Sequence, residues 1–125
     1  MKKIKKLTGK KALVTGGTRG IGAEIAYELK NLGAEVTITG TKPLSSESDY
    51  HYLCSSFEKI DNLLSLVDIV KKSKFDILIN NAGINKVESI LDINISDFNR
   101  IQQVNVTAPF MLIQAVLPHM QEKKW

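Results

Sequence analysis

The sequence has a single cysteine, Cys54, only three prolines, and no apolar run that approaches the length of a membrane span. One cysteine cannot form an internal disulfide, and it suggests no metal cluster. A helix that crosses a bilayer needs about 20 apolar residues, so we expect no membrane-embedded segment. The basic opening Met1–Lys6 also lacks the apolar segment of a signal peptide. These absences predict a soluble protein of the cytoplasm.

Beyond the basic opening, charge of one sign is not concentrated in any long segment. Seventeen Lys and Arg residues face 13 Asp and Glu residues, which gives a net charge of +4. The cationic residues are scattered, and neither a recognition motif nor stacking aromatic residues accompany them. We therefore expect a solvated basic surface and no nucleic-acid partner. The 43% hydrophobic and 24% charged residues are typical of a globular chain, and 125 residues make one domain at most.

Apolar, β-branched segments alternate with segments of helical periodicity. We expect strands at Lys11–Thr15, Ala34–Thr39, Tyr50–Cys54 and Phe75–Asn80, and helices over Gly20–Leu32, Glu58–Lys72 and Ser96–Glu122. In the first helix, Ile21, Ile25, Leu29 and Leu32 recur at helical spacing. Such alternation with short connections implies right-handed crossovers and a parallel sheet. The sequence thus predicts an α/β fold with a doubly wound parallel sheet, Rossmann-like in type.

A glycine-rich turn, Thr15–Gly22, connects the first strand to the first helix. Gly16 and Gly17 permit a tight reversal. A side chain at Gly20 would hold a phosphate away from the backbone, and one at Gly22 would push the helix off the sheet. The free N–H groups and the helix dipole at this point favour an anion. We expect the pyrophosphate of a dinucleotide here, held by Gly16, Thr18, Arg19, Gly20, Ile21 and Gly22; the alternative is a purely structural turn.

Four motifs, in order along the chain, resemble those of the short-chain dehydrogenase/reductase family. They are the Thr-Gly-x-x-x-Gly-x-Gly turn, Asn80-Asn81-Ala82-Gly83, Val104-Asn105-Val106 with Pro109, and Leu117-Pro118-His119-Met120. Among members of the family, the 3-oxoacyl-(acyl-carrier-protein) reductases look most similar. The resemblance implies an NAD(P)-dependent oxidoreductase that acts on a small carbonyl or alcohol substrate. It also implies that residues 1–125 form an NAD(P)-binding domain that is incomplete at its C-terminus.

The resemblance assigns roles to the second and third motifs. Asn81 would contact the nicotinamide-side ribose, Ala82 and Gly83 would bring backbone close to the cofactor, and Asn80 would tie neighbouring strands together. Asn105 would belong to the catalytic tetrad and anchor a water of the proton relay. The sequence offers a physical reason, because Pro109 has no N–H to donate to the carbonyl of Asn105 and should kink the helix. The alternative is that Asn105 only stabilises the kink.

The residues after the second predicted strand favour NADP(H) over NAD(H). An NAD enzyme usually has Asp or Glu there to bind the ribose 2′-OH, but the position falls at Gly40. Thr41 can donate a hydrogen bond to a 2′-phosphate and Lys42 offers charge, while Arg19 resembles the basic residue of NADP-using relatives. The alternative is that Arg19 and Lys42 are solvated surface charges.

The serines after the third strand and the two histidines have no clear functional assignment. The family has an adenine-binding Asp after the third strand, and Ser56, or else Ser55, stands in its place; Ser56 could equally be a helix cap. His51 and His119 have no partners at metal-ligand spacing, so both are expected at the surface.

The chain ends before the residues that carry hydride transfer in the family, a Ser and a Tyr followed four residues later by a Lys. None of Tyr27, Tyr50 and Tyr52 has such a lysine. We therefore expect a truncated or fragmentary oxidoreductase, inactive by itself, whose fourth strand is left as an exposed apolar edge. The complete enzyme would form a homo-oligomer. The alternative is a non-catalytic nucleotide-binding or assembly module that pairs with a full-length relative.

Overall fold

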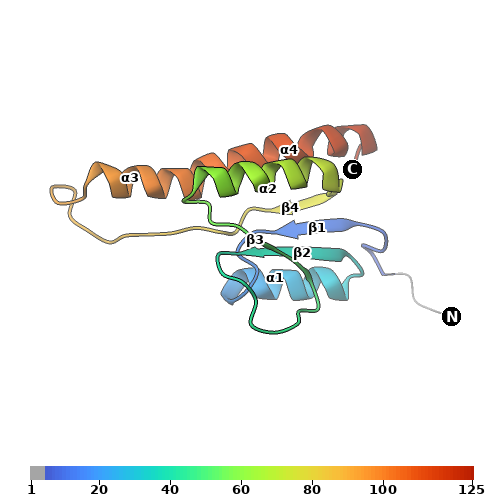
Figure 1. The fold of residues 1–125 in the computed structure, drawn as a ribbon. Coiled ribbons are helices and arrows are strands. Elements are labelled where there is room, and N and C mark those ends of the chain that lie inside the picture. The colour runs from blue at the N-terminus through green and yellow to red at the C-terminus, as the bar shows by residue number, and fades with distance from the viewer. Residues whose placement is uncertain (1–4) are drawn as a thin grey trace.

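A parallel four-stranded sheet forms the centre of the computed structural model, which describes residues 5–125 (Figure 1). The strands are β1 (Lys11–Val14), β2 (Glu35–Gly40), β3 (His51–Cys54) and β4 (Ile77–Ile79), in the order β3-β2-β1-β4. The helices are α1 (Gly20–Asn31), α2 (Ile60–Ser73), α3 (Ile95–Gln102) and α4 (Ala108–Lys123), with the π-helical turn η1 (Gln103–Thr107) between the last two. The predicted Rossmann-like α/β fold is confirmed.

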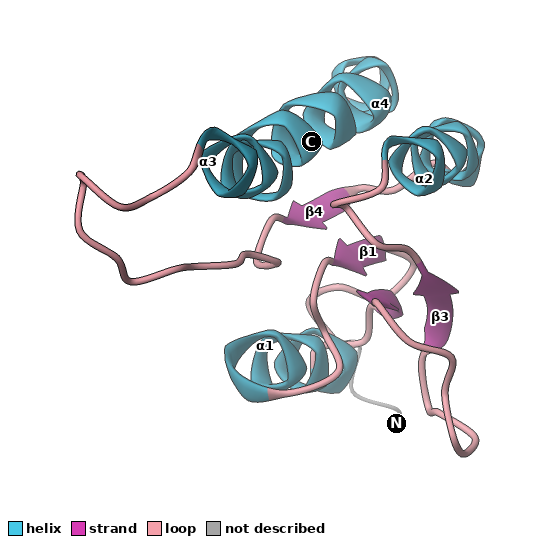
Figure 2. Cartoon of the chain, turned by 60° about the vertical axis from the view of Figure 1, so that its left-hand side comes forward, coloured by secondary structure: helices cyan, strands magenta, loops and turns pink. Residues whose placement is uncertain are grey.

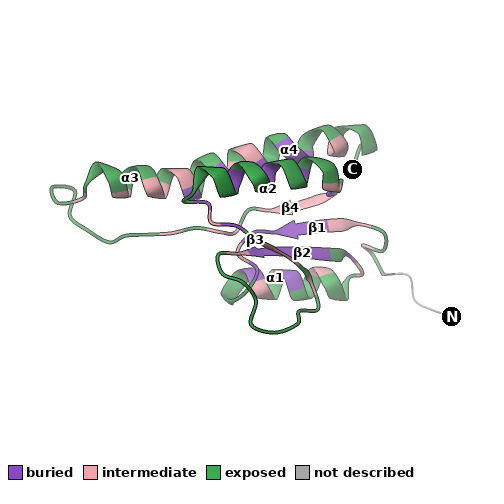
Figure 3. Ribbon diagram, in the orientation of Figure 1, coloured by how far each residue is buried: buried purple, intermediate pink, exposed green. Residues whose placement is uncertain are grey.

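Helices cover both faces of the sheet. Figure 2 shows α1 on one face and α2, α3 and α4 on the other. Successive residues of β1 point to opposite faces, so Leu13 joins the core under α2 and α4 while Ala12 and Val14 join the core under α1. All three are fully buried (Figure 3). A central strand buried on both faces is typical of parallel sheets.

The contact face of α1 only partly follows the spacing of its apolar residues. Gly33 has a φ of +101° and follows the last residues of the helix, as expected of a C-terminal cap. However, Ile21 is 75% exposed, and the buried residues of α1 are Gly22 and Ala26. Ile25 and Leu29 pack against the core under α1 as partly buried side chains, whereas the small residues Gly22 and Ala26 occupy the fully buried positions of the helix.

The predicted single helix Ser96–Glu122 is divided by η1. Its start is capped by Asn94, whose Oδ1 accepts the N–H of Asp97 at 2.8 Å. The π-helical turn comes immediately before Pro109, which lacks the N–H that an α-helical bond to Asn105 would need. The disturbance predicted at Asn105 is therefore confirmed, in the form of a widened turn.

The strand β4 forms one edge of the sheet, where it pairs with β1. Its three residues are half-buried. The strand thus lies at an edge as predicted, but its apolar side chains are half-buried and Phe75 is buried, so the apolar edge is less exposed than predicted. None of the helices in the described range is long and apolar enough to cross a membrane.

A hydrogen-bonded pair, His119 and Asp76, attaches the end of α4 to the start of β4. Nε2 of His119 donates to Oδ1 of Asp76 at 2.9 Å, and the other carboxylate oxygen accepts the backbone N–H of Lys11 at 2.9 Å. Both side chains of the pair are nearly buried, at 11% and 12% exposure. The prediction of a surface histidine is therefore wrong for His119, because a long-range partner covers it. His51 is exposed as predicted.

Acid is expected to weaken the fold through Asp76. Partial burial by itself raises the pKa of Asp76, but hydrogen bonds from Lys11 and His119 and the charge of Lys10 outweigh it and lower the pKa below its usual value. A lowered pKa in the folded state means that stability is present above the unfolded pKa of about 4 and is lost as pH falls through the folded pKa. Asp76→Asn should therefore reduce stability at pH 7 and flatten its fall below about pH 4. Chemical denaturation at several pH values measures this, with the exposed Asp68→Asn as the matched control; equal acid dependence in both variants would contradict the assignment.

Candidate functional site

A cavity of about 690 Å³ lies at the carboxyl edge of the sheet, where all four parallel strands end. Ligands of open α/β sheets bind at this edge. Its walls come from the glycine turn, the end of β2, the segment between β3 and α2, and the segment after β4. From the predicted site the structure brings together Gly16, Thr18, Arg19, Gly20, Thr41, Ser56, Asn81, Ala82 and Gly83.

The glycine turn has the backbone conformation that a phosphate-binding turn requires. Gly16 and Gly20 have φ of +64° and +57°, in the left-handed region that favours glycine. A Cβ built on Gly20 meets no atom within 4 Å, so the backbone at the N-terminus of α1 faces open space. This is the arrangement in which free N–H groups and the helix dipole receive an anion.

Two other glycines of the turn act through packing, in ways that differ from the prediction. A Cβ on Gly22 would lie 2.2 Å from the carbonyl oxygen of Gly16, so the turn itself, rather than the sheet, excludes a side chain. Gly17 does not have a positive φ. A Cβ there would lie 2.6 Å from Cγ2 of Ile38, so Gly17 permits close contact with β2.

Asn81 connects the end of β4 to the glycine turn. Its side-chain N–H groups donate to the carbonyls of Thr15 and Gly16, at 3.0 and 3.1 Å. In return, the hydroxyl of Thr15 accepts the backbone N–H groups of Asn81 and Ala82, each at 3.0 Å. The strand-tying role predicted for Asn80 is thus filled by Asn81, whereas Asn80 is exposed. The Oδ1 of Asn81 carries no hydrogen bond within residues 5–125 and stays able to accept one.

Asn105 holds the next part of the same wall. Its Oδ1 accepts the N–H of Ile84 and its Nδ2 donates to the carbonyl of Ile84, both at 2.8 Å. The π-helical turn presents this side chain to the segment after β4. A Cβ on Gly83 would lie 3.4 Å from Asn105, an ordinary contact, so protein packing does not require glycine there.

At the end of β2, Tyr52 lies beside Gly40, which lines the cavity. A Cβ on Gly40 would lie 2.5 Å from the hydroxyl of Tyr52 and 2.8 Å from Cγ2 of Thr18. The Tyr52 hydroxyl donates to the carbonyl of Lys42. Burial, more than any neighbouring group, raises the pKa of Tyr52, so the hydroxyl keeps its proton at neutral pH. The Tyr52 side chain therefore takes up the space that a side chain at position 40 would need.

The two serines after β3 both line the cavity. Ser55 is buried, and its hydroxyl donates to the carbonyl of Asn62 at 3.2 Å. The backbone N–H of Ser56 donates to the side chain of Asn62 at 3.3 Å. The helix-cap alternative for Ser56 is wrong, because α2 begins at Ile60 and its N-cap residue is Lys59.

Four residues of the predicted site, Ile21, Gly22, Lys42 and Asn105, lie outside the cavity lining, and the side chains of Ile21 and Lys42 are exposed. Lys59 lines the cavity and was not predicted. A lysine at the start of a helix is unusual, since the dipole there favours acidic groups; that mismatch could have drawn attention to it.

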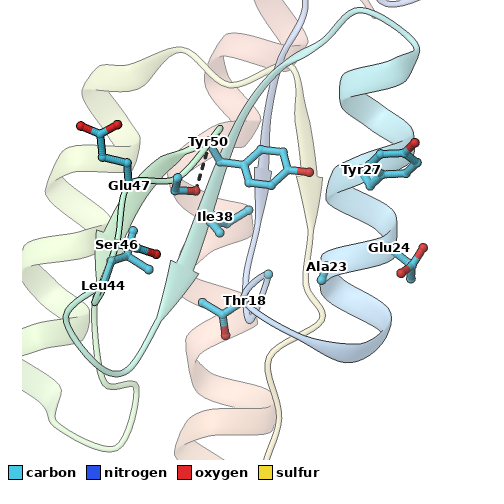
Figure 4. A pocket seen from close by; sticks show the side chains of 11 residues that line it. Thr18, Ala23, Glu24, Tyr27, Ile38, Leu44, Ser46, Glu47 and Tyr50 are labelled. Atoms are coloured by element: carbon cyan, nitrogen blue, oxygen red, sulfur yellow. Dashed lines mark hydrogen bonds between the residues drawn. The ribbon is translucent and has the colours of Figure 1, made fainter.

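A second hollow, of about 500 Å³, lies on the other side of Thr18, between α1 and the segment after β2 (Figure 4). Its wall carries the carboxylates of Glu24 and Glu47 beside Tyr27 and Tyr50. These negative charges oppose a phosphate. The first cavity differs in charge, because its lining includes Arg19 and Lys59 beside Glu58. No group of three potential metal ligands exists in the described part of the chain.

Comparisons with known proteins agree with this geometry. The chain is 37% identical to the 3-oxoacyl-[acyl-carrier-protein] reductase FabG of Aquifex aeolicus, over 96% of this chain and 54% of that protein. It superposes on a 3-oxoacyl (acyl-carrier-protein) reductase of Agrobacterium tumefaciens with NADP bound, with a TM-score of 0.84 and 29% identity over 95% of this chain and 50% of that one. A blue fluorescent protein from a metagenomic library, in complex with NADPH, gives a TM-score of 0.80 and 31% identity over 91% and 52%.

The chain spans about half the length of the curated relatives that it matches. Residues 10–125 match the family model described as short chain dehydrogenase. This range includes the glycine turn, Asn81 with its hydrogen bonds to that turn, and the π-helical turn at Asn105. The chain therefore belongs to the short-chain dehydrogenase family of oxidoreductases.

Proposed function

We propose that the cavity at the carboxyl edge binds NADP(H). The observation that carries the proposal is the open backbone at Gly20, with positive φ, at the N-terminus of α1. The pyrophosphate would lie against Gly16–Gly22, with Thr18 and Ile21 contributing backbone N–H groups. Asn81 has an acceptor left for a ribose hydroxyl, and Ala82 and Gly83 offer close backbone approach on the nicotinamide side.

The preference for NADP(H) over NAD(H) follows from the surroundings of Gly40. A carboxylate that would bind the 2′-OH of NAD has no room there while Tyr52 and Thr18 keep their places. Arg19 and Thr41 line the cavity, so a guanidinium and a hydroxyl are available to a 2′-phosphate. Lys42, exposed and outside the cavity lining, would add long-range attraction only. At the adenine end, Ser55 and Ser56 replace the family's carboxylate, and the Ser55 hydroxyl can still accept a hydrogen bond.

We further propose that the reaction is of the carbonyl reductase or alcohol dehydrogenase type, on a small-molecule substrate. The bound nicotinamide would supply or accept hydride. This chain would bind and orient the cofactor, and Asn105 would hold the segment after β4 through Ile84 while its main-chain carbonyl, deprived of a donor by Pro109, accepts a water. The general acid–base chemistry requires a tyrosine with a lowered pKa, and burial raises the pKa of Tyr50 and Tyr52 instead. The chain by itself is expected to show no turnover.

Titration with the two cofactors tests the binding proposal. The chain should quench and shift the fluorescence of NADPH in a saturable manner, with a Kd at least about tenfold lower than for NADH, because two charge-assisted contacts to the 2′-phosphate are lost with NADH. Arg19→Ala should reduce this ratio toward one. Tighter binding of NADH would contradict the cofactor preference, and no saturable signal from folded chain would contradict the proposal as a whole.

A second candidate function is an assembly module that pairs with a full-length relative. It is favoured by the edge position of β4 and by exposed apolar side chains on the last helix, namely Phe110, Ile113 and Leu117. Mixing the chain with a purified full-length reductase and measuring mass by light scattering tests it. A mixed species supports pairing, whereas two unchanged peaks contradict it.

A further inference from the structure

Tyr52 belongs to none of the four family motifs, yet it contacts the segment Gly40–Lys42, of which Gly40 and Thr41 line the cavity. In β3 it pairs with Ile38 of β2, which places its ring beside the last residue of that strand, Gly40. The ring is half-buried and packs with the core under α1. Its position is therefore set by the sheet and not by a loop.

The hydroxyl of Tyr52 has two consequences for the turn that follows β2. It lies 2.5 Å from the place of a Cβ at Gly40, and it donates to the carbonyl of Lys42, two residues further on. One phenol thus fills the side-chain space at position 40 and fixes the backbone between Gly40 and Lys42. Thr41, which lines the cavity, is held in the middle of that segment.

We propose that Tyr52 is a positioning residue for cofactor selection: it holds the Gly40–Lys42 turn in the conformation that accepts a 2′-phosphate, and it excludes a carboxylate at position 40. This inference rests on the proposed binding of NADP(H). An unanchored turn would let Thr41 leave the cavity wall, while the glycine turn, to which the Tyr52 hydroxyl makes no hydrogen bond, would keep the pyrophosphate site. Loss of the hydroxyl should consequently weaken NADPH binding far more than NADH binding.

The first test compares Tyr52→Phe with Tyr50→Phe. The two tyrosines lie two residues apart on the same core, but the hydroxyl of Tyr50 has no partner among the described residues. Tyr52→Phe should raise the Kd for NADPH roughly fivefold, the usual cost of one lost hydrogen bond, and leave the Kd for NADH within twofold, whereas Tyr50→Phe should change neither. A merely structural role would weaken both cofactors alike, so an unchanged ratio of the two Kd values overturns the inference.

The second test uses the filled space at position 40. Gly40→Asp alone should lose NADPH binding without gaining NADH binding, because the new side chain meets the Tyr52 hydroxyl. Adding Tyr52→Ala removes the nearest of the atoms that occupy this space and leaves only Cγ2 of Thr18, which a rotation about χ1 can move. NADH binding should then tighten about tenfold over the single variant, since the carboxylate can reach a ribose 2′-OH. Equal NADH affinity of the single and double variants overturns the inference. Failure of the unsubstituted chain to bind NADPH overturns the proposed function itself, so the two failures are distinguishable.

Discussion

Gly22→Ala is expected to destabilise the chain by about 3 kcal/mol and to abolish cofactor binding, the largest effect of any single methyl group considered. The added carbon would lie 2.2 Å from the carbonyl oxygen of Gly16 and 2.4 Å from Nδ2 of Asn81. Neither atom can move cheaply, because one is backbone and the other is fixed by two hydrogen bonds to the turn. The helix must therefore shift away from the turn, and the N–H groups at its start shift with it.

Thermal unfolding and NADPH titration together measure this effect. A loss of about 3 kcal/mol corresponds to a fall in Tm of roughly 10 °C for a chain of this size. Gly83→Ala is the matched control for stability, since its added carbon would meet Asn105 at 3.4 Å, an ordinary contact, without backbone strain. Its Tm should stay within about 2 °C of the original. An equal fall in Tm in both variants would contradict the conclusion that close packing at Gly22 stabilises the turn.

Asn81→Ala is expected to cost roughly 2–3 kcal/mol, because two main-chain carbonyls of the turn lose their donors in a partly buried place. Gly16 would lose the group that fixes its carbonyl, and the cofactor affinity should fall along with the stability. The expected fall in Tm is the second largest of the substitutions discussed.

The neighbouring Asn80→Ala provides the control for Asn81. The two residues are chemically identical and adjacent, but Asn80 is exposed and should lose less than about 0.5 kcal/mol. Urea denaturation of both variants measures the difference. Equal loss at the two positions would mean that the strand tie predicted from the sequence for Asn80 exists after all, and that the contacts of Asn81 are not decisive.

Local patterns were sufficient to predict the strands, the glycine turn and the disturbance at Pro109, because each depends on neighbours along the chain. The face of α1 was not predictable in this way. Ile21 fits the helical period as well as Ile25 does, but only the approach of the turn decides that Gly22 and Ala26 are buried. The spacing of apolar residues shows which face of a helix is apolar, but it does not show how closely that helix approaches the sheet.

The same limit applies to the candidate site. The motif predicts that Asn80 and Asn81 are close to the cofactor cavity, but which of them points inward depends on where β4 ends relative to Thr15, 66 residues away. Tyr52 and Lys59 carry no motif, and their places follow from strand pairing and from the start of α2. Contacts between distant segments thus account for most of what the sequence did not predict.

The hydrogen bonds around the glycine turn also affect the thermodynamics of ligand binding. Side chains from three strand ends, those of Thr15, Thr39 and Asn81, hold the turn from both sides, with Thr39 accepting the N–H of Gly16 at 3.1 Å. A pyrophosphate would therefore meet a receptor that is already rigid and would not have to order it. Little conformational entropy of the protein is lost when such a site binds its ligand. Association is therefore expected to be fast. The heat-capacity change of binding should reflect only the surface that loses its water.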